Sequence, residues 1–375
     1  MSDSCVFCIK QNNLLNFMAA CAGFFFIMVF QVHIADAKDS SRAEWMRGSW
    51  GVRIILPAGE RYELYHFKVQ ELISQLKSLK SVSWVMLNLT NENDGAHFTG
   101  PNILLEEIDA NMAPSRDLLG EVALGLSKIG IKTIVYFDSR GPQSKNFDQY
   151  CVGDKGNNSA CRNIIGIQKN WARFLKDKGI NNHAAIAQNC IEYYSKKYGN
   201  LISGWWFDAG PDADYSSFSQ AARTGNQSAA VAFNKHLSSG SLIAGYGAKG
   251  EKVFARALSV ETMDEDYTAG HPTPMHYQSP NWEGNEAMID SIRDWELSHN
   301  SVAHVFLPMQ KGWAHGKPSF EAKQAADWTS RALRENGALT WAAAMKRNSS
   351  TIEEYQFRQL QSIDRAVIEH RTLIK

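Results

Sequence analysis

The chain has 375 residues, of which 44% are hydrophobic, 11% aromatic and 21% charged, and these are the values of an ordinary globular protein. Lys and Arg together number 39, as do Asp and Glu, so the formal net charge is zero. This balance argues against a nucleic acid partner, which usually requires a clustered basic surface.

The first 37 residues have the pattern of a signal peptide. Lys10 supplies a positive charge, Leu14 to Phe30 form an apolar run, and Ala35-Asp36-Ala37 offers a small-residue cleavage site before Lys38. The run is slightly long, so an uncleaved membrane anchor is the alternative. No later stretch is long and apolar enough to span a bilayer. We therefore expect residues 38–375 to be secreted, either to the periplasm or outside the cell, without stable membrane association.

The cysteines do not predict a metal site. Three of the six lie in the predicted signal peptide; Cys151 and Cys161 could close the loop between them, which would leave Cys190 as a buried thiol. The chain has no Cys-x-x-Cys pair and no His-Glu-x-x-His motif, which argues against a structural zinc site and a metalloprotease. We expect neither a metal nor a cofactor.

From residue 50 onward, short apolar runs alternate with longer amphipathic stretches. The runs are continuously apolar, which indicates strands buried on both faces, as in a parallel sheet covered by helices. Eight strands, most followed by a helix, predict a single (β/α)8 TIM barrel over residues 38–375. The predicted strands are 52–56, 82–89, 133–137, 202–207, 242–246, 258–261, 303–307 and 338–343.

The helical patterns between these runs complete the predicted barrel. A doubly wound open sheet is the competing architecture, but Leu56-Pro57-Ala58-Gly59 after the first strand lacks the Gly-rich turn of dinucleotide-binding folds. The fifth strand is followed by only a short connector. The predicted helices are 62–79, 115–129, 182–198, 216–237, 287–298, 320–335 and 351–373.

Polar and aromatic side chains follow most of the predicted strands. Active sites of (β/α)8 barrels lie at the carboxyl ends of the strands, so these side chains should meet at one rim. Carboxylates, amides and aromatic rings at one rim are typical of a sugar site, because hydroxyls need polar partners and bond cleavage needs two carboxyl groups. The candidates are Asn91, Asp94, Asp138, Trp206, Asp208, Tyr246, Glu261, Glu265, Asp266, His271 and Trp313.

Asp208 is the central candidate. It follows Trp205-Trp206-Phe207, so it ends a strand that is otherwise apolar. A helix cap is the competing role, but Asp212 and Asp214 lie closer to the helix that begins near Ser216. For Asp138 the two roles stay open.

The segment Gly204 to Gly210, which reads Gly-Trp-Trp-Phe-Asp-Ala-Gly, resembles the strand-four signature of α-L-fucosidases. The segments from Asp266 to Pro274 and Asn281 to Glu283 are similar to two further elements of that family. The resemblance implies a barrel that hydrolyses fucosidic bonds, with Asp208 as the nucleophile.

The chain departs from the α-L-fucosidase pattern on the first two strands. It reads Val52-Arg53-Ile54-Ile55-Leu56-Pro57 where the family has Phe-Ile-His-Trp-Gly, and Glu92-Asn93 where the family has paired histidines. Related barrels that cleave sulfated fucans internally share the strand-four Asp and vary the sugar-binding residues. The chain resembles these endo-fucanases at least as well, which implies a polysaccharide or oligosaccharide substrate.

The expected reaction is retaining hydrolysis, in which a second group donates a proton to the leaving oxygen. We predict Glu265 for this role, with Glu261 second; the resemblance to fucan-cleaving barrels keeps His271 and His276 open. The acidic run that contains Glu265 could instead be a solvated or cation-binding loop. Cations that would contact sulfate groups are Arg140, Lys311, Lys346 and Arg347.

Two other classes of protein remain open. A carbohydrate-binding barrel without catalysis would explain the departures from the fucosidase pattern. A barrel deacetylase or metal-dependent lyase would need a metal cluster, and His97, Asp138 and His271 are too scattered in the sequence to indicate one.

Overall fold

The computed structural model describes residues 41–373 except 60, 91–94, 144–158, 209–212, 235–241, 247–251, 257, 261, 272–281, 311–312 and 315. Contacts within the chain separate Met1–Ser41 from Arg42–Lys375, and the fold described here is that of the second unit. The predicted signal peptide lies outside the described residues. Of the helices that the structure describes, none combines the length and the apolarity that crossing a bilayer requires.

The core of the molecule is a curled sheet of seven strands in the order β5-β4-β3-β2-β1-β9-β8. Every neighbouring pair in this sheet is parallel, as the continuously apolar runs predict. The strands are β1 (Ser49–Ile54), β2 (Val82–Asn88), β3 (Lys132–Asp138), β4 (Ile202–Asp208), β5 (Ala230–Phe233), β8 (His304–Pro308) and β9 (Ala338–Ala342).

Residues 265–271, which we call the closing segment, join the two edges of this sheet. On one side, the Asp266 N–H donates to the Val231 carbonyl of β5 at 2.9 Å. On the other side, the Thr268 N–H donates to the Val302 carbonyl at 3.0 Å, and the Phe306 N–H of β8 donates to the Gly270 carbonyl at 2.9 Å. The closing segment therefore joins the seven strands as the eighth member of the barrel, sixth in chain order, and the prediction of a single (β/α)8 barrel is confirmed.

Two of the eight predicted strands do not belong to the barrel sheet. β6 (Leu242–Tyr246) and β7 (Lys252–Arg256) form an antiparallel hairpin of their own, outside the barrel sheet. The fifth barrel strand is β5, which lies in the stretch predicted as helix 216–237, and the sixth place belongs to the closing segment instead of residues 258–261. β5 has only four residues, so its apolar run cannot be distinguished from the continuation of a buried helix by periodicity.

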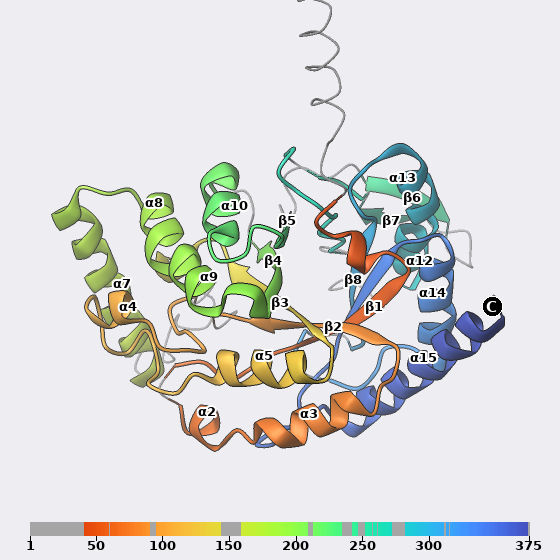
Figure 1. Ribbon diagram of the computed structural model, residues 1–375, viewed down its shortest axis with the longest axis horizontal. Coiled ribbons are helices and arrows are strands. Elements are labelled where there is room, and N and C mark those ends of the chain that lie inside the picture. Colours follow the sequence, from red (N-terminus) through yellow and green to blue (C-terminus); the bar gives the residue numbers. More distant parts are fainter. Residues whose placement is uncertain are drawn as a thin grey trace, which may run out of the picture. The chain divides into compact units, whose positions relative to one another are not determined.

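Helices surround the strands. Figure 1 shows them outside the sheet in chain order, from α3 and α5 through α7–α10 to α12–α15. Predicted helix 62–79 is two helices, α2 and α3, and α7 is a helix that the pattern did not predict. The helices are α2 (Tyr62–His66), α3 (Val69–Lys77), α4 (Ile103–Glu106), α5 (Leu118–Lys128), α7 (Ser159–Lys178), α8 (Asn182–Ile186), α9 (Tyr193–Tyr198), α10 (Tyr215–Arg223), α12 (Trp282–Asp290), α13 (Ile292–Ser298), α14 (Ala322–Arg334) and α15 (Glu354–Leu373).

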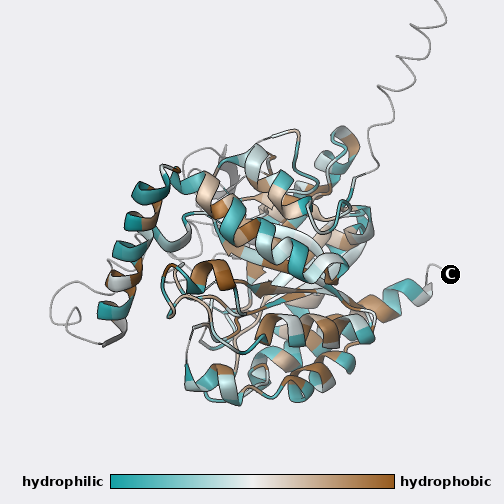
Figure 2. Cartoon of the chain, turned by 60° about the vertical axis from the view of Figure 1, so that its left-hand side comes forward, coloured by the Kyte–Doolittle hydropathy of each residue, from teal (hydrophilic) through white to brown (hydrophobic). Residues whose placement is uncertain are grey.

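The helices are amphipathic, and their apolar sides face the strands. On α14, for example, Ala325, Trp328 and Ala332 are buried, whereas Lys323 and Asp327 are exposed. Figure 2 shows the same alternation of apolar and polar bands along the helices. The apolar layer between helices and strands is therefore one continuous core, in which residues of both kinds of element pack together.

A second, smaller core fills the inside of the barrel. It contains alternate residues of the strands and none of the helices α2–α15, so its side chains point toward the barrel axis. Its members include Trp84 and Met86 of β2, Ile134 and Tyr136 of β3, Trp206 of β4, Ala230 and Ala232 of β5, Tyr267 and Ala269 of the closing segment, and Phe306 of β8. Because side chains alternate along a strand, this set also identifies which residues at the carboxyl ends of the strands point inward.

Candidate active site

Four polar side chains continue the inward-pointing series at the carboxyl ends of neighbouring strands. Asp138 lies two residues after Tyr136, Asp208 two after Trp206, and Asn234 two after Ala232. His271 follows Ala269 in the same way on the closing segment. These four side chains therefore form the polar layer above the apolar interior of the barrel.

Asp208 lies at the centre of this layer and is held on both sides. The Tyr136 hydroxyl donates a hydrogen bond to its Oδ2 atom, and the Asn234 amide donates to its Oδ1 atom at 2.8 Å. The residue is 9% exposed. It does not cap a helix: the cap of α10 is Asp214, whose side chain accepts from the Ser217 N–H. The carboxylate is therefore fixed in orientation at the inner surface of the barrel mouth.

Tyr136 is a neutral donor in this pair. Burial, the charge of Asp208 and the charge of Asp138 all raise the pKa of the Tyr136 phenol well above its ordinary value. Its ring stacks on Trp206 with 5.2 Å between the centroids, and the Arg53 guanidinium lies 5.1 Å from the same ring. The phenol ring is therefore fixed by Trp206 and Arg53. Its hydroxyl keeps its proton and donates it in the hydrogen bond to Asp208.

Asp138 is paired with a cation. Its Cα is in register with that of Asp208, and its carboxylate accepts from Arg140 Nε at 2.9 Å and Nη2 at 2.7 Å. Burial raises the pKa of Asp138, and the bonds from Arg140 oppose that rise. Because Arg140 forms both bonds at once, it holds a positive charge beside the two carboxylates. In addition, Asp138 Oδ1 accepts from the Arg140 N–H at 3.0 Å, within a local turn and not as a helix cap.

Aromatic rings pack around His271 in the polar layer. His271 stacks on Trp313, with 4.5 Å between the centroids and an angle of 20° between the planes, and its ring lies 5.8 Å from that of Trp206. Phe306 packs edge-on against Trp206 at 5.2 Å. Trp206 is fully buried beneath these rings, whereas Trp313 is partly exposed. Of the two predicted tryptophans, Trp313 is therefore the one with a face that a sugar could contact.

Glu265 and Asp266 have structural partners at the edge of β5. Glu265 accepts from the Phe233 N–H at 2.9 Å and from the Thr262 N–H at 3.0 Å. Asp266 accepts from the Val231 N–H at 2.9 Å and from Arg223 at 2.8 Å. These two predicted residues are not part of the polar layer. Their carboxylates accept hydrogen bonds from backbone N–H groups of the short strand β5.

Tyr246 is not at the end of a barrel strand, because its segment forms the hairpin strand β6. Lys346 and Arg347 are exposed on a turn after β9.

Among the described side chains, no cluster of His, Cys, Asp and Glu could hold a metal ion. Asn91, Asp94, Glu261, His276 and Lys311 lie outside the described residues, as does Cys151. Cys161 is disulfide-bonded, and Cys190 is the buried free thiol that the sequence predicts.

Two residues of the site, Tyr136 and Asn234, are not among the candidates from the sequence. Tyr136 has a signal in the sequence, since it precedes Asp138 by two residues and must point to the same face of its strand. Asn234 had no such signal, because β5 was predicted as part of a helix. Both were identified only through their bonds to Asp208.

A carboxylate held by two donors at the carboxyl end of β4 places the chain among the (β/α)8 barrels that act at this rim. The chain matches the family model of the endo-alpha(1,4)-fucoidanase Mef1 over residues 40–372. It belongs to this family and is accordingly a glycoside hydrolase.

Solved structures with the same fold support the barrel. Endo-fucoidan hydrolase P5AFcnA, from glycoside hydrolase family 107, is 19% identical with a TM-score of 0.71 over 87% of this chain and 93% of that one. Endo-fucoidan hydrolase MfFcnA4 is 21% identical with a TM-score of 0.68 over 86% of this chain, which spans only 53% of that protein. Alpha-L-fucosidase AlfC from Lactobacillus casei, in complex with alpha-L-fucose, is 11% identical with a TM-score of 0.51 over 89% and 100%. No curated protein sequence matches the chain.

Proposed function

We propose that this protein cleaves fucosidic bonds inside fucoidan, a sulfated fucan, by retaining hydrolysis with Asp208 as the nucleophile. The observation that carries the proposal is the fixed, inward-pointing carboxylate of Asp208 with one neutral donor on each oxygen. The family match supports the substrate and the internal mode of cleavage.

The two donors suit a nucleophilic carboxylate. Tyr136 and Asn234 orient Asp208 and spread its negative charge, as suits a carboxylate that attacks the anomeric carbon. The attack breaks the glycosidic bond and forms a glycosyl ester on Asp208. In the second step water cleaves this ester, and the same donors stabilise the carboxylate as it leaves.

The proton donor in this proposal is His271, not Glu265. Glu265 accepts from backbone N–H groups with both of its oxygens, which favours a structural role. His271 lies in the polar layer, is 7% exposed, and is fixed against Trp313 and Trp206. An imidazolium group can give a proton to the leaving oxygen, and the imidazole can then accept one from the attacking water.

Substitution of Asp208 tests the nucleophile. We expect wild-type protein to release a ladder of fragments from fucoidan, with the α configuration retained at the new reducing end in NMR spectra. Asp208→Asn should lower the rate by about a thousandfold or more, because the amide cannot form the ester. Asp327→Asn, on the exposed face of α14, is the matched control and should keep the rate. Fucan binding without any fragments from the wild type would favour a non-catalytic barrel instead.

A second pair of variants separates His271 from Glu265. His271→Gln should slow the cleavage of fucoidan about a hundredfold or more and remove the alkaline limb of the pH profile. An aryl glycoside of a fuco-oligosaccharide, whose leaving group needs no proton, should be affected much less. Glu265→Gln should lower the midpoint of thermal unfolding while the pH profile keeps its shape. If Glu265→Gln instead changed the pH profile and His271→Gln left it unchanged, Glu265 would be the proton donor.

Secretion through the predicted signal peptide is a further part of the proposal. The leader pattern at residues 1–37 and a polysaccharide substrate both fit an exported enzyme. Expression of the full chain in a secreting host, followed by sequencing of the amino terminus of the exported protein, tests it. A terminus at Lys38 is expected, and protein retained in the cell with an intact leader would contradict it.

A further inference from the structure

A groove on the outer wall of the barrel, away from the polar layer, has the features of a second binding site. It has a volume of about 550 Å³ and lies between the start of α14 and the first half of α15. We name it the α14–α15 groove and define it by the lining residues Pro318, Phe320, Tyr355, Arg358, Gln359 and Arg365; the lining also contains Glu321, so the two arginines exceed the acidic side chains by one.

Three side chains of α15 line this groove along one face of the helix. Tyr355, Arg358 and Arg365 are three and seven residues apart, so they lie on the same side of the helix over about 15 Å. Tyr355 is 61% exposed, which leaves its ring free to contact the C–H face of a sugar. The two guanidinium groups are suited to bind sulfate in the bidentate manner known for phosphate.

Neither arginine is committed to a strong internal contact. Arg358 pairs with Glu354 one turn earlier, but both side chains are more than half exposed, and such surface pairs contribute little. Arg365 donates to the Ser362 hydroxyl at 3.2 Å. Both cations can therefore bind an anion without loss of a buried interaction.

Gln359 connects the two sides of the groove, which fixes the wall that Tyr355 and the arginines share. Gln359 is 5% exposed, and its Nε2 atom donates to the Phe320 carbonyl at 2.5 Å, which fixes the orientation of the amide. Its Oε1 atom has no hydrogen-bond partner among the described residues. This oxygen is closed off from solvent, so a buried water, and not a ligand in the groove, is the group that would satisfy it.

The groove is connected to the active site through the segment 310–318. Pro318 lines the groove and forms a bridge with Gln310, whose side chain donates to the Trp313 carbonyl at 3.1 Å. Trp313 in turn stacks on His271. The wall of the groove is therefore linked through Gln310 to the tryptophan that packs on the proposed proton donor.

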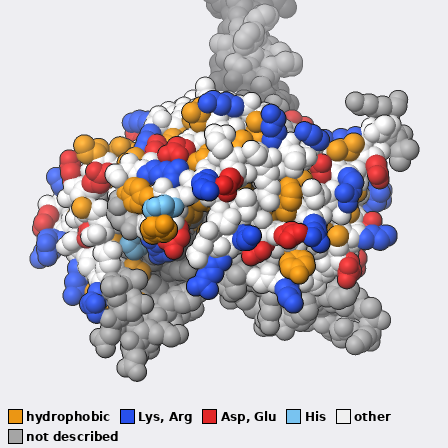
Figure 3. Space-filling view, turned by 90° about the horizontal axis from the view of Figure 1, so that it is seen from below, with side chains coloured by type: hydrophobic (Ala, Val, Ile, Leu, Met, Phe, Trp, Pro, Cys, Tyr) orange, Lys and Arg blue, Asp and Glu red, His pale blue; other side chains and the backbone are white. Residues whose placement is uncertain are grey.

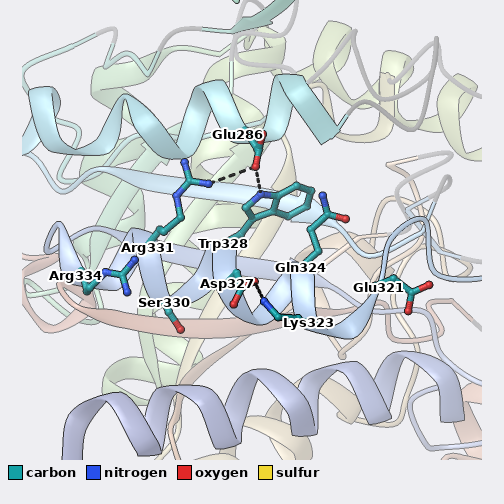
Figure 4. A pocket seen from close by; sticks show the side chains of 9 residues that line it. All are labelled: Glu286, Glu321, Lys323, Gln324, Asp327, Trp328, Ser330, Arg331 and Arg334. Atoms are coloured by element: carbon teal, nitrogen blue, oxygen red, sulfur yellow. Dashed lines mark hydrogen bonds and ion pairs between the residues drawn. The ribbon is translucent and has the colours of Figure 1, made fainter. Parts of the chain in front are cut away.

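A neighbouring hollow of about 560 Å³ between α12 and α14 differs in its chemistry. Figure 4 shows its charges directed toward one another, with Arg331 bonded to Glu286 and Lys323 bonded to Asp327. Figure 3 likewise shows charges of both signs interspersed on the lower face of the molecule. The α14–α15 groove is the better candidate because its aromatic ring, that of Tyr355, is 61% exposed, whereas Trp328 of the neighbouring hollow is buried.

We infer that the α14–α15 groove binds the sulfated fucan chain outside the active site and holds the polymer on the enzyme. This inference rests on the proposed function for the identity of the polymer. The sulfate groups contact Arg358 and Arg365, and a sugar ring stacks on Tyr355. The ligand class is thus an anionic polysaccharide, in contrast to a neutral glycan.

Binding measurements on a variant of the groove test this inference. Tyr355→Ala, Arg358→Gln and Arg365→Gln are combined in the Asp208→Asn background, so that the polymer stays intact during affinity electrophoresis in gels that contain sulfated fucan. The apparent Kd should rise about tenfold or more, and the salt dependence of binding should fall because two cations are lost. In active protein, the same three changes should lower the ratio of the rate on polymer to the rate on a short sulfated fuco-oligosaccharide.

A control variant removes the same groups elsewhere on the surface. Tyr62→Ala, Arg293→Gln and Arg334→Gln delete one tyrosine that is 72% exposed and two exposed arginines, so the net charge is matched. This control should bind as the Asp208→Asn protein does, and Arg365→Gln alone should show part of the loss. Chemically desulfated fucan should bind much more weakly than sulfated fucan.

The outcomes separate this inference from the proposed function. Equal affinities of the groove variant and the control, in a protein that cleaves fucoidan, would overturn the groove alone. Equally tight binding of desulfated fucan would overturn the recognition of sulfate. A wild-type protein that releases no fragments, but loses fucan binding when the groove is changed, would overturn the proposed function and leave the groove.

Discussion

At the scale of single residues, the chemistry at Asp208 depends on what its two oxygens accept. Tyr136 and Asn234 come from the strands on either side of β4, and each donates to a different oxygen. A carboxylate bound in this way stays ionised more readily than one that faces only apolar groups. The donors therefore control both the direction and the basicity of the proposed nucleophile.

Tyr136→Phe is predicted to slow catalysis without unfolding the barrel. The substitution removes one hydrogen bond to a charged group, which is worth about 1.5–3 kcal/mol, so kcat/KM should fall about ten- to hundredfold. The pKa of Asp208 should rise when the donor is lost, which moves the acidic limb of the pH–rate profile to higher pH. Tyr267→Phe, which removes a bond to the Trp205 carbonyl, is the control and should leave that limb in place. An unchanged profile for Tyr136→Phe would count against the role.

His304 inside the barrel is predicted to make stability depend on pH. Burial lowers the pKa of its imidazole to about 4 in the folded state, against about 6.5 in the unfolded chain. Between these values only the unfolded chain is protonated, so the free energy of unfolding rises with pH through this window and is lost as pH falls. The loss should reach about 3 kcal/mol below pH 4. Urea denaturation of wild type and His304→Gln at pH 7, 5.5 and 4.5 measures it; parallel pH dependences of the two proteins would refute the assignment.

At the scale of secondary structure elements, the closing segment completes the barrel and also places His271. Thr268 and Gly270 bond to the β8 side of the gap, and Asp266 bonds to β5 on the other. Only one isolated bridge, between Tyr267 and Val302, has the regular pattern of a strand pair. The position of the closing segment therefore depends on the close approach of its backbone to that of β8.

Gly270→Ala is predicted to disrupt that approach. Gly270 has φ +63°, and a Cβ there would lie 2.1 Å from the His304 carbonyl oxygen. Because the atoms that the Cβ would meet are packed backbone atoms, the segment must move to relieve the clash, and we expect a loss of about 3 kcal/mol or more in the free energy of unfolding. Activity should fall as well, since His271 is the next residue.

A second glycine provides the control for this prediction. Gly130 has φ +77° but nothing within 4 Å of the added Cβ, so Gly130→Ala should cost only about 1 kcal/mol from the backbone conformation. Chemical denaturation of both variants gives the comparison. Similar losses for the two would show that the contact with His304 is not limiting.

At the scale of the whole molecule, the last helix attaches the end of the chain to its beginning. Asp364 of α15 is buried, and its Oδ1 atom accepts from the Ser81 N–H at 2.6 Å and from the Ser81 hydroxyl at 2.7 Å, just before β2. Gln75 of α3 is bonded to Ile352 near the start of α15. The ring of helices is therefore joined between its first and last members.

Asp364→Ala is predicted to weaken this junction. It removes the carboxylate that accepts from both buried donors of Ser81 and leaves the hydroxyl only the more distant carbonyl of residue 364, so the free energy of unfolding should fall by about 2–4 kcal/mol. Asp327→Ala on the exposed face of α14 serves as the control and should change stability by less than about 0.5 kcal/mol. Guanidinium denaturation provides the measurement, and equal midpoints for the two variants would argue against the junction.

Much of this architecture follows from the sequence. Continuous apolar runs and amphipathic stretches determine the parallel strands and the helices outside them, because burial on both faces leaves no room for polar alternation. The same pattern determines that Asp208 ends a buried strand, and that Tyr136 and Asp138 share a face. Two observations predict Asp208 as the central carboxylate: its position at the end of a buried strand, and the resemblance of its segment to the strand-four signature of α-L-fucosidases.

Only the tertiary structure decided the positions of β5, the closing segment and the proposed proton donor. Four apolar residues are too short for their own preferences to distinguish a strand from a helix, so hydrogen bonds from β4 and from Asp266 determine their conformation. The partners of Glu265 and Asp266 on β5 lie more than thirty residues earlier in the chain. A carboxylate near a strand end can serve chemistry or structure, and contacts between residues so distant in sequence decide which.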